Sequence, residues 1–332
     1  MQAMILAAGM GKRLKELTNN NTKCMVEVNG ETLIKRMLSQ LDQLDLSKII
    51  MVVGYKAEPL LQYISTLSIK TKIEYVENEI FNKTNNIYSL FLARHYLLEE
   101  DTLLLESDLI FESSILKKIV DDPYPSLALV AKYESWMDGT VVTLDGNNIT
   151  SFLDKKSFKF SETSDYYKTV NIYKFSKEFS ASHYVPFLEA YSKALGDNEY
   201  YEQVLKVISL LDKPEIKAVR LENEDWYEID DLQDLDIAES IFAQSQEKKL
   251  NKFQIRYGGY WRYPEMIDFC YLVNPFFPPR KLIDEMKANF TRLLSEYPSG
   301  LRVNNLLAGK YFGVDQSFIC IGNGAAELIK SL

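Results

Sequence analysis

A glycine-rich stretch close to the start of the chain combines residue types that bind phosphate. Leu6-Ala7-Ala8-Gly9-Met10-Gly11-Lys12-Arg13-Leu14 follows directly on a short apolar run. Small residues let backbone N–H groups wrap an anion, and the glycines permit close approach. The adjacent lysine and arginine supply positive charge to phosphate oxygens. Because the spacing fits neither the dinucleotide-binding fingerprint nor the P-loop, it indicates a phosphate site of another type.

An apolar run that ends in acids offers ligands for a divalent cation. Leu103-Leu104-Leu105-Glu106-Ser107-Asp108 reads as a buried strand that leads into an aspartate. In α/β sheets ligands bind beyond the carboxyl ends of the strands, and Mg²⁺ takes hard oxygen ligands. Asp108, past the predicted end of the strand, is therefore the expected metal ligand, and Glu106 within the strand is the alternative.

A second acidic cluster lies much later in the chain, in Trp226-Tyr227-Glu228-Ile229-Asp230-Asp231-Leu232. Glu228 and Asp230 are two positions apart, so an extended backbone points both carboxylates to the same side. Both can therefore serve one site. Asp231 suits the N-cap of the helix that is predicted to follow, which is a structural role.

The elements that must position these residues alternate between strands and helices. Short β-rich runs at residues 4–6, 48–53, 72–76, 102–106 and 127–131 predict buried strands. Residues 31–44 and 86–98, which lie between them, each carry an apolar stripe at helical spacing. This alternation predicts an α/β fold: a Rossmann-like three-layer arrangement with a mostly parallel central sheet.

The pattern changes after Lys132. Residues 140–153 predict a β-hairpin around a turn of Gly and Asn residues. Two helices at 176–195 and 199–211, a strand at 216–221 and a helix at 231–242 are expected to close the unit. The polar stretch at 244–249 predicts a linker, so we expect a domain over 1–243, a linker over 244–259 and a separate piece over 260–332.

The loop and the residues downstream of it resemble the nucleotidyltransferase superfamily of sugar-phosphate and choline-phosphate activating enzymes. The family pattern LAAGxGxRL, followed by PKxLxxVxGxxLI, is matched by residues 6–14 and by Thr22-Lys23-Cys24-Met25-Val26-Glu27-Val28-Asn29-Gly30, with Thr22 in place of the usual proline. The resemblance implies that Arg13 contacts the triphosphate, and that Lys23 contacts the α-phosphate and the acceptor phosphate. The implied nucleotide-binding residues of the loop are Leu6, Ala7, Ala8, Gly9, Gly11 and Lys12.

Two further motifs are similar to the choline-phosphate cytidylyltransferase branch of this family. In that branch a Glu-Ile-Asp sequence like that at residues 228–230 completes the metal site, so the implied Mg²⁺ ligands are Asp108, Glu228 and Asp230. The run Asn85-Asn86-Ile87-Tyr88-Ser89-Leu90 also matches and lies next to the cytosine and the acceptor there. Asn86 and Ser89 are therefore expected to bind the nucleotide, which favours CTP, although the run also suits helix capping.

The same branch suggests residues for the acceptor. Trp136, Tyr173 and Tyr201 with Glu202 could form a cage for a quaternary ammonium, and Lys155 stands where relatives carry a lysine for the acceptor phosphate. Core packing is the alternative for the aromatic residues, because the chain has 21 tyrosines. A primary amine or zwitterionic acceptor would use the same acids with fewer rings.

Composition narrows the function class. The net charge of −9 argues against nucleic acid as a partner, and no apolar run is long enough to span a membrane. Cys24, Cys270 and Cys320 form no CxxC pair, which argues against a disulfide framework. The chain enters a predicted strand at once without a signal peptide, so we expect a cytoplasmic protein.

Residues 260–332 resemble the beginning of a class I aminotransferase of the histidinol-phosphate aminotransferase type. The motifs are Asn274-Pro275-Phe276-Phe277-Pro278-Pro279 and Ile321-Gly322-Asn323-Gly324-Ala325-Ala326-Glu327. In that family the glycine turn meets the phosphate of PLP at a helix N-terminus, and the Schiff-base lysine lies further downstream than Leu332. The expectation is a truncated piece of a longer fusion enzyme, with PLP chemistry only in a complete domain, and the alternative is that this piece is a remnant. Its exposed apolar face makes a homodimer an expectation.

These features predict an Mg²⁺-dependent cytidylyltransferase. It would transfer CMP from CTP to phosphocholine, phosphoethanolamine, phosphoserine or an aminoalkylphosphonate, with release of pyrophosphate. The alternatives are a sugar-1-phosphate nucleotidyltransferase, which the Glu-Ile-Asp motif disfavours, and a nucleotide-sensing module without turnover. The retained Lys23, Asp108, Glu228 and Asp230 disfavour the latter.

Overall fold

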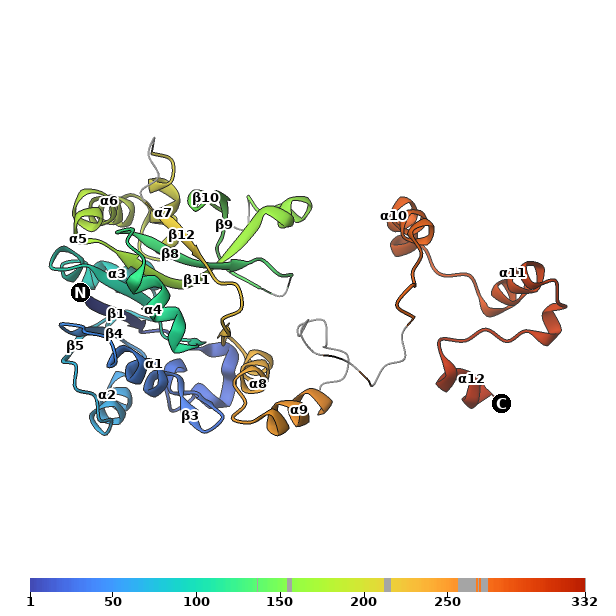
Figure 1. The fold of residues 1–332 in the computed structure, drawn as a ribbon, viewed down its shortest axis with the longest axis horizontal. Coiled ribbons are helices and arrows are strands. Elements are labelled where there is room, and N and C mark those ends of the chain that lie inside the picture. Colours follow the sequence, from blue (N-terminus) through green and yellow to red (C-terminus); the bar gives the residue numbers. More distant parts are fainter. Residues whose placement is uncertain are drawn as a thin grey trace. The chain divides into compact units, whose positions relative to one another are not determined.

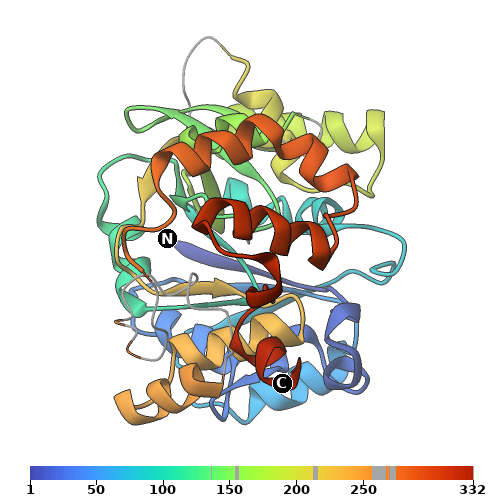
Figure 2. The same cartoon turned by 90° about the vertical axis from the view of Figure 1, so that its right-hand side faces the viewer.

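The computed structural model describes residues 1–135, 137–153, 157–211, 216–255, 267, 269 and 274–331. They form two compact units, Met1–Arg262 and Tyr263–Leu332. Within the range of the expected linker, 244–259, the described residues 246–255 are helical. Helix α9 (Gln246–Ile255) packs against α8 (Leu232–Ile241), and Lys252 of α9 pairs with Glu239 of α8 (Figures 1 and 2). A polar sequence can still form a surface helix, because only a narrow stripe has to pack.

Parallel strands form one side of the central sheet of the first unit. Within the described residues this sheet has nine strands in the order β5-β4-β1-β6-β11-β8-β12-β10-β9. The first four in this order are parallel to one another, which confirms the predicted strands: β5 (Ile73–Glu77), β4 (Ile49–Val53), β1 (Gln2–Ala7) and β6 (Thr102–Glu106). Every residue of β1 and of β4 is buried, as expected for strands covered on both faces.

The sequence suggested a mostly parallel sheet. The other side of the sheet is instead mixed, with both parallel and antiparallel strands. The reason is β11 (Tyr166–Phe175), which runs antiparallel to both β6 and β8 (Leu127–Lys132). The predicted hairpin is present as β9 (Val141–Asp145) and β10 (Asn148–Leu153), and β12 (Lys217–Arg220) lies between β8 and β10. Polar residues at buried positions of β11 hid this strand from sequence reasoning.

Helices cover both faces of the sheet, so the predicted three-layer α/β fold is confirmed (Figure 1). Alternate residues of β1 show why: Ala3 and Ile5 join one core, whereas Met4 and Leu6 join the other. The first core packs against α1 (Leu33–Leu41), α2 (Ala57–Ser65) and α4 (Ser113–Asp121). The second packs against α3 (Asn86–Ala93), α6 (Val185–Leu195) and α7 (Glu202–Ile208).

Two small ladders flank the sheet. Strand β7 (Leu109–Phe111) pairs antiparallel with β13 (Trp226–Glu228), so that Glu228 lies opposite Leu109. Strand β2 (Glu27–Val28) pairs with β3 (Glu31–Thr32) just before α1. The first of these ladders joins the two acidic clusters of the sequence.

The second unit contains α10 (Arg280–Ser295), α11 (Leu301–Phe312) and α12 (Ala325–Ser331), drawn in orange to red in Figure 2. Large apolar side chains such as Phe290, Leu294 and Leu307 are exposed in this unit. Its resemblance to the start of an aminotransferase stays a prediction. Across both units, none of the helices in the described ranges has the length and hydropathy needed to cross a membrane.

Candidate active site

The loop after β1 forms one wall of a cavity of about 950 Å³. Gly11 has a left-handed backbone, with φ at 57°, and a Cβ at this position would lie 3.0 Å from the Cβ of Lys23. The loop therefore needs glycine here both for its backbone angle and for its contact with the lysine. The cavity wall includes all of the loop residues predicted to bind the nucleotide: Leu6, Ala7, Ala8, Gly9, Gly11 and Lys12.

Lys23 joins the two acidic clusters. Its Nζ donates to Oδ2 of Asp108 at 2.5 Å and to Oδ1 of Asp230 at 2.6 Å. Burial alone would lower the pKa of Lys23, but the charges of the two carboxylates and their hydrogen bonds outweigh it and raise the pKa. The lysine is thus held as a cation at the centre of the site.

The ladder between β7 and β13 brings these carboxylates together. Asp108 directly precedes β7, and its carbonyl oxygen accepts a hydrogen bond of 3.0 Å from the backbone of Ile229, between Glu228 and Asp230. Asp108, Glu228 and Asp230 each offer one carboxylate oxygen, and these oxygens lie within 4.8 Å of one another. Asp231 caps α8, as predicted, and accepts from the backbones of Gln233 and Asp234.

The donor set of this cluster fits a divalent cation such as Mg²⁺. Oδ1 of Asp108 is buried and has no hydrogen-bond partner among the described residues, which a hard cation would satisfy. The second oxygen of Asp230 pairs with Arg13 at 2.8 Å. Burial would raise the pKa of Asp230, but the nearby charges of Lys23 and Arg13 lower it and keep the carboxylate ionised.

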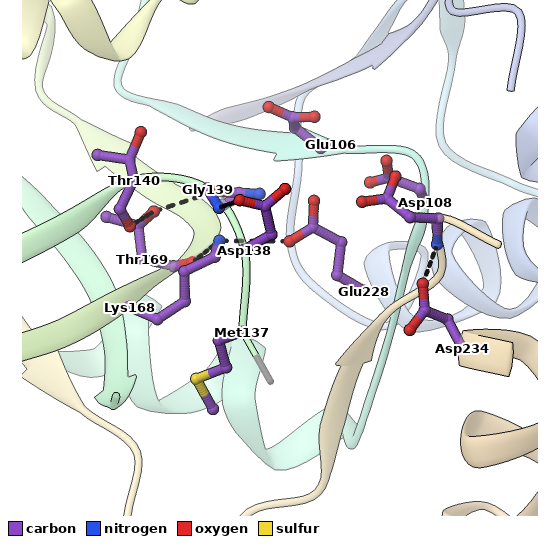
Figure 3. A network of polar contacts seen from close by, with 12 residues as sticks. Glu106, Asp108, Met137, Asp138, Gly139, Thr140, Lys168, Thr169, Glu228 and Asp234 are labelled. Carbon is purple, nitrogen blue, oxygen red and sulfur yellow. Dashed lines mark hydrogen bonds and ion pairs between the residues drawn. The ribbon is translucent and has the colours of Figure 1, made fainter. Parts of the chain in front are cut away.

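Lys168, on β11, was not among the predicted site residues but lies beside the acidic cluster. It is 1% exposed, and its Nζ donates to the carbonyl of Thr169 at 2.7 Å and lies 3.3 Å from Oε2 of Glu228 (Figure 3). Gly139, with φ at 97°, lies beside it, and a Cβ there would be 3.2 Å from the same Nζ. A lysine between tyrosines and β-branched residues is the sequence signal that could have revealed it, because a buried ammonium needs an acid partner.

Asn86 and Ser89 of α3 line the cavity, as the sequence suggested, but their polar groups already have partners. The Nδ2 of Asn86 donates to Oε1 of Glu106 at 3.1 Å, and its Oδ1 accepts from the backbone of Tyr201 at 3.0 Å. Ser89 is buried, and its Oγ accepts from Nδ2 of Asn78 at 3.1 Å. Asn85 caps α3, so this run also has the structural role that was the alternative.

The predicted acceptor residues separate into two groups. Glu202 lines the cavity, and burial raises its pKa to about 7. Tyr173 and Tyr201 are fully buried and pack edge to face with ring centroids 5.8 Å apart, outside the cavity wall. These two rings complete the core between β11 and α7, which corrects the prediction that they form a cage. Trp136 and Lys155 lie outside the described residues.

Comparisons with known proteins identify the family of the chain and several relatives. The family model of the MobA-like NTP transferase domain matches residues 3–168. The CMP-5'-(3-aminopropyl)phosphonate synthase of Streptomyces rubellomurinus is 28% identical over 334 residues, which cover all of this chain and 53% of that protein. The CTP:phosphoglutamine cytidylyltransferase of Campylobacter jejuni is 27% identical over 259 residues, which cover 71% of this chain and 98% of the relative.

A solved structure shares the fold. The CTP:phosphocholine cytidylyltransferase of Streptococcus pneumoniae superposes with a TM-score of 0.60 at 23% identity, over 72% of this chain and 98% of that protein. The chain spans about half of the length of the Streptomyces synthase that it matches.

Proposed function

Since the chain belongs to the MobA-like NTP transferase family, we propose that it transfers CMP from CTP to a small acceptor that carries a phosphonate or phosphate group. Membership of this family makes the chain a nucleotidyltransferase. What we propose is the base of its nucleotide, cytosine, and the kind of acceptor that it uses. The names of two relatives, an aminopropylphosphonate CMP synthase and a phosphoglutamine cytidylyltransferase, support both parts.

The observation that carries the proposal is the cluster of Asp108, Glu228 and Asp230 beside Lys23 and Arg13. Three of their carboxylate oxygens lie within 4.8 Å of one another. Together with the two cations and the glycine-rich loop, these acids line a nucleotide-sized cavity. We assign the carboxylates to a Mg²⁺ ion, which would supply positive charge next to the triphosphate.

The reaction needs no covalent enzyme intermediate. An ionised oxygen of the acceptor attacks the α-phosphorus of CTP, the new P–O bond forms in line, and the bond from the α-phosphorus to the bridging oxygen breaks. The electron pair leaves with pyrophosphate. Arg13 and Lys23 stabilise the charge that develops on the phosphate oxygens, and the loop holds the triphosphate in position. The acceptor oxygen carries a negative charge at neutral pH, so no general base is required.

A pyrophosphate-release assay tests this proposal. CTP, UTP, ATP and GTP are each combined with 2-aminoethylphosphonate, 3-aminopropylphosphonate, phosphocholine and glucose 1-phosphate in the presence of Mg²⁺. We expect turnover with CTP and at least one of the first three acceptors. Turnover only with UTP or another nucleotide and glucose 1-phosphate would overturn the proposal in favour of a sugar-phosphate enzyme.

A further inference from the structure

The turn that follows β4 contacts two loops that line the cavity. Gly54 and Tyr55 lie between β4 and α2, and within the described ranges the cavity wall includes neither of them. A Cβ on Gly54 would lie 3.0 Å from the Cβ of Ala8 and 3.0 Å from the Cβ of Phe81, which both line the cavity. The glycine-rich loop and the loop after β5 therefore both pack on this turn, closely enough to favour glycine.

Tyr55 binds the glycine-rich loop near its start and again where it ends. Its backbone N–H donates to the carbonyl of Ala8 at 3.2 Å. Its hydroxyl donates to the carbonyl of Thr18 at 3.0 Å and lies 3.3 Å from the carbonyl of Asn19. Thr18 in turn donates from Oγ1 to the carbonyl of Gly11 at 3.0 Å. One residue outside the loop thus fixes the beginning and the end of the segment that carries the loop cations.

The segment between these two ends is mostly exposed. Among residues 12–18, only Leu14 and Thr18 are buried. Lys15 has φ at 51° and ψ at −118°, a conformation that residues with a Cβ rarely adopt. Such a conformation persists only where the surrounding contacts fix it. The hydrogen bonds of Tyr55 and Thr18 supply contacts of this kind.

The turn is itself anchored to the opposite wall of the cavity. The rings of Tyr55 and Phe81 pack edge to face, with centroids 5.8 Å apart. The backbone N–H of Asn78 donates to the carbonyl of Val53 at 2.8 Å, and its Nδ2 donates to Oγ of Ser89 at 3.1 Å. The hydroxyl of Tyr55 is therefore held in place by a ring contact and by a well-ordered neighbouring loop.

From these contacts we infer that Tyr55 is a positioning residue for the triphosphate. It holds the glycine-rich loop in its phosphate-binding shape without lining the cavity itself. This inference rests on the proposed function in one point, that the loop binds the triphosphate. A loop that is fixed before binding loses less conformational freedom when the ligand arrives, so it binds more tightly. The contribution of Tyr55 should therefore depend on the number of phosphates that the nucleotide carries.

Tyr55→Phe tests this, because it removes the hydroxyl and keeps the ring that packs on Phe81. Calorimetry with Mg²⁺ and without acceptor compares CTP with CMP. We expect the Kd for CTP to rise by about 5- to 10-fold and the Kd for CMP to stay unchanged. In turnover, the KM for CTP should rise while the KM for the acceptor stays the same. A residue that only supports the fold would instead lower kcat through the active fraction and leave both KM values unchanged.

Tyr63→Phe is the matched control. The hydroxyl of Tyr63, on α2, lies 2.9 Å from Oγ1 of Thr32, and the residue is outside the cavity wall. Both tyrosine variants should lower Tm slightly, and only Tyr55→Phe should weaken CTP binding. Equal losses of CTP affinity in the two variants, or equal losses for CTP and CMP in Tyr55→Phe, would overturn the inference.

A double-mutant cycle provides a second measurement. Thr18→Val removes the hydrogen bond to Gly11 and keeps the size of the side chain. If Tyr55 and Thr18 restrain the same segment, the double variant should lose less CTP affinity than the product of the two single effects. Strictly multiplicative effects would show that they act independently and would count against a shared role in the loop.

The choice of nucleotide separates this inference from the proposed function. If UTP or ATP binds and turns over and CTP does not, the proposed function is wrong, and that nucleotide with its monophosphate then tests Tyr55 in the same way. If the wild type binds no nucleoside triphosphate more tightly than the monophosphate, the loop is not a triphosphate site and the inference is overturned.

Discussion

The Nζ of Lys168 lies 3.3 Å from Oε2 of Glu228, and Gly139 leaves the space that this lysine occupies. A Cβ on Gly139 would lie 3.1 Å from Cε of the lysine. The lysine is thus a fixed positive charge behind the proposed metal site, and it orients one of the three carboxylates. Groups that orient metal ligands in this way commonly change metal affinity when they are replaced.

Replacing Lys168 by methionine tests this role. The variant keeps the length of the side chain but leaves Glu228 without its ion pair, so we expect the Mg²⁺ concentration for half-maximal activity to rise by about 10-fold or more. A titration of Mg²⁺ in the pyrophosphate-release assay measures this change. Lys168→Arg keeps the charge and should recover part of the affinity. An unchanged Mg²⁺ dependence in Lys168→Met would mean that the lysine only fills space.

Replacing Gly139 by alanine should disturb the same pair from the other side. The backbone of Gly139 has φ at 97°, and the new Cβ would press on Lys168, so both stability and Mg²⁺ affinity should fall. Gly146→Ala is the matched control, because Gly146 also has a positive φ, of 59°, but has open space around its Cβ position. Both variants should lower Tm, and only Gly139→Ala should change the Mg²⁺ titration. Identical Mg²⁺ titrations in the two variants would separate Gly139 from the metal site.

Replacing Asp108 by asparagine should reduce kcat by about 100-fold or more, because the proposed metal site loses one negative ligand. Circular dichroism should show an intact fold. Asp231→Asn is the control, since asparagine caps a helix as well as aspartate does and the residue lies next to the cluster in sequence. It should retain nearly all activity. If Asp108→Asn kept more than a few per cent of the wild-type kcat, Asp108 would not be a metal ligand.

The ion pair between Glu224 and Lys118 predicts a pH-dependent contribution to stability. Burial raises the pKa of Glu224, but the hydrogen bond from Lys118 at 2.6 Å and two backbone N–H groups lower it, to about 2. The folded pKa is lower than the unfolded one, so the stabilisation is present above the unfolded pKa and is lost as the pH falls through the folded pKa.

Denaturant unfolding of Glu224→Gln should therefore show a loss of about 1–2 kcal/mol at pH 7, since the pair is only partly shielded from solvent. The difference from the wild type should shrink below the usual glutamate pKa and vanish near pH 2. Glu222→Gln, on the same exposed loop, is the control and should have little effect. A difference that stayed constant down to pH 2 would rule out the ionised carboxylate as its source.

Local patterns in the sequence predicted the loop, the parallel strands and the acidic clusters, because each depends on neighbouring residues. The loop lies within residues 6–14, and Glu228 and Asp230 share one extended segment. Lys168 could not be predicted in the same way, since its acid partner lies on another strand and only the fold brings them together. Polar residues in β11, such as Lys168 and Asn171, also hid the strand itself.

Tyr173 and Tyr201 show a second limit of predicting site residues from the sequence. An aromatic residue near an acid in sequence suits both a cation cage and a core, and periodicity does not separate these roles. Tyr173 and Tyr201 lie in the core because β11 and α7 face each other across the second hydrophobic cluster. Asn86 likewise has its amide engaged by Glu106 and Tyr201, two partners that are distant in the sequence.

The ladder between β7 and β13 determines when, during synthesis of the chain, the three carboxylates come together. During synthesis the loop, Lys23 and Asp108 leave the ribosome early, whereas Glu228 and Asp230 emerge only after the whole central sheet. A nascent chain that stops before Trp226 therefore has most of its nucleotide wall but only one of the three carboxylates. The proposed cation site is therefore complete only when β13 has paired with β7.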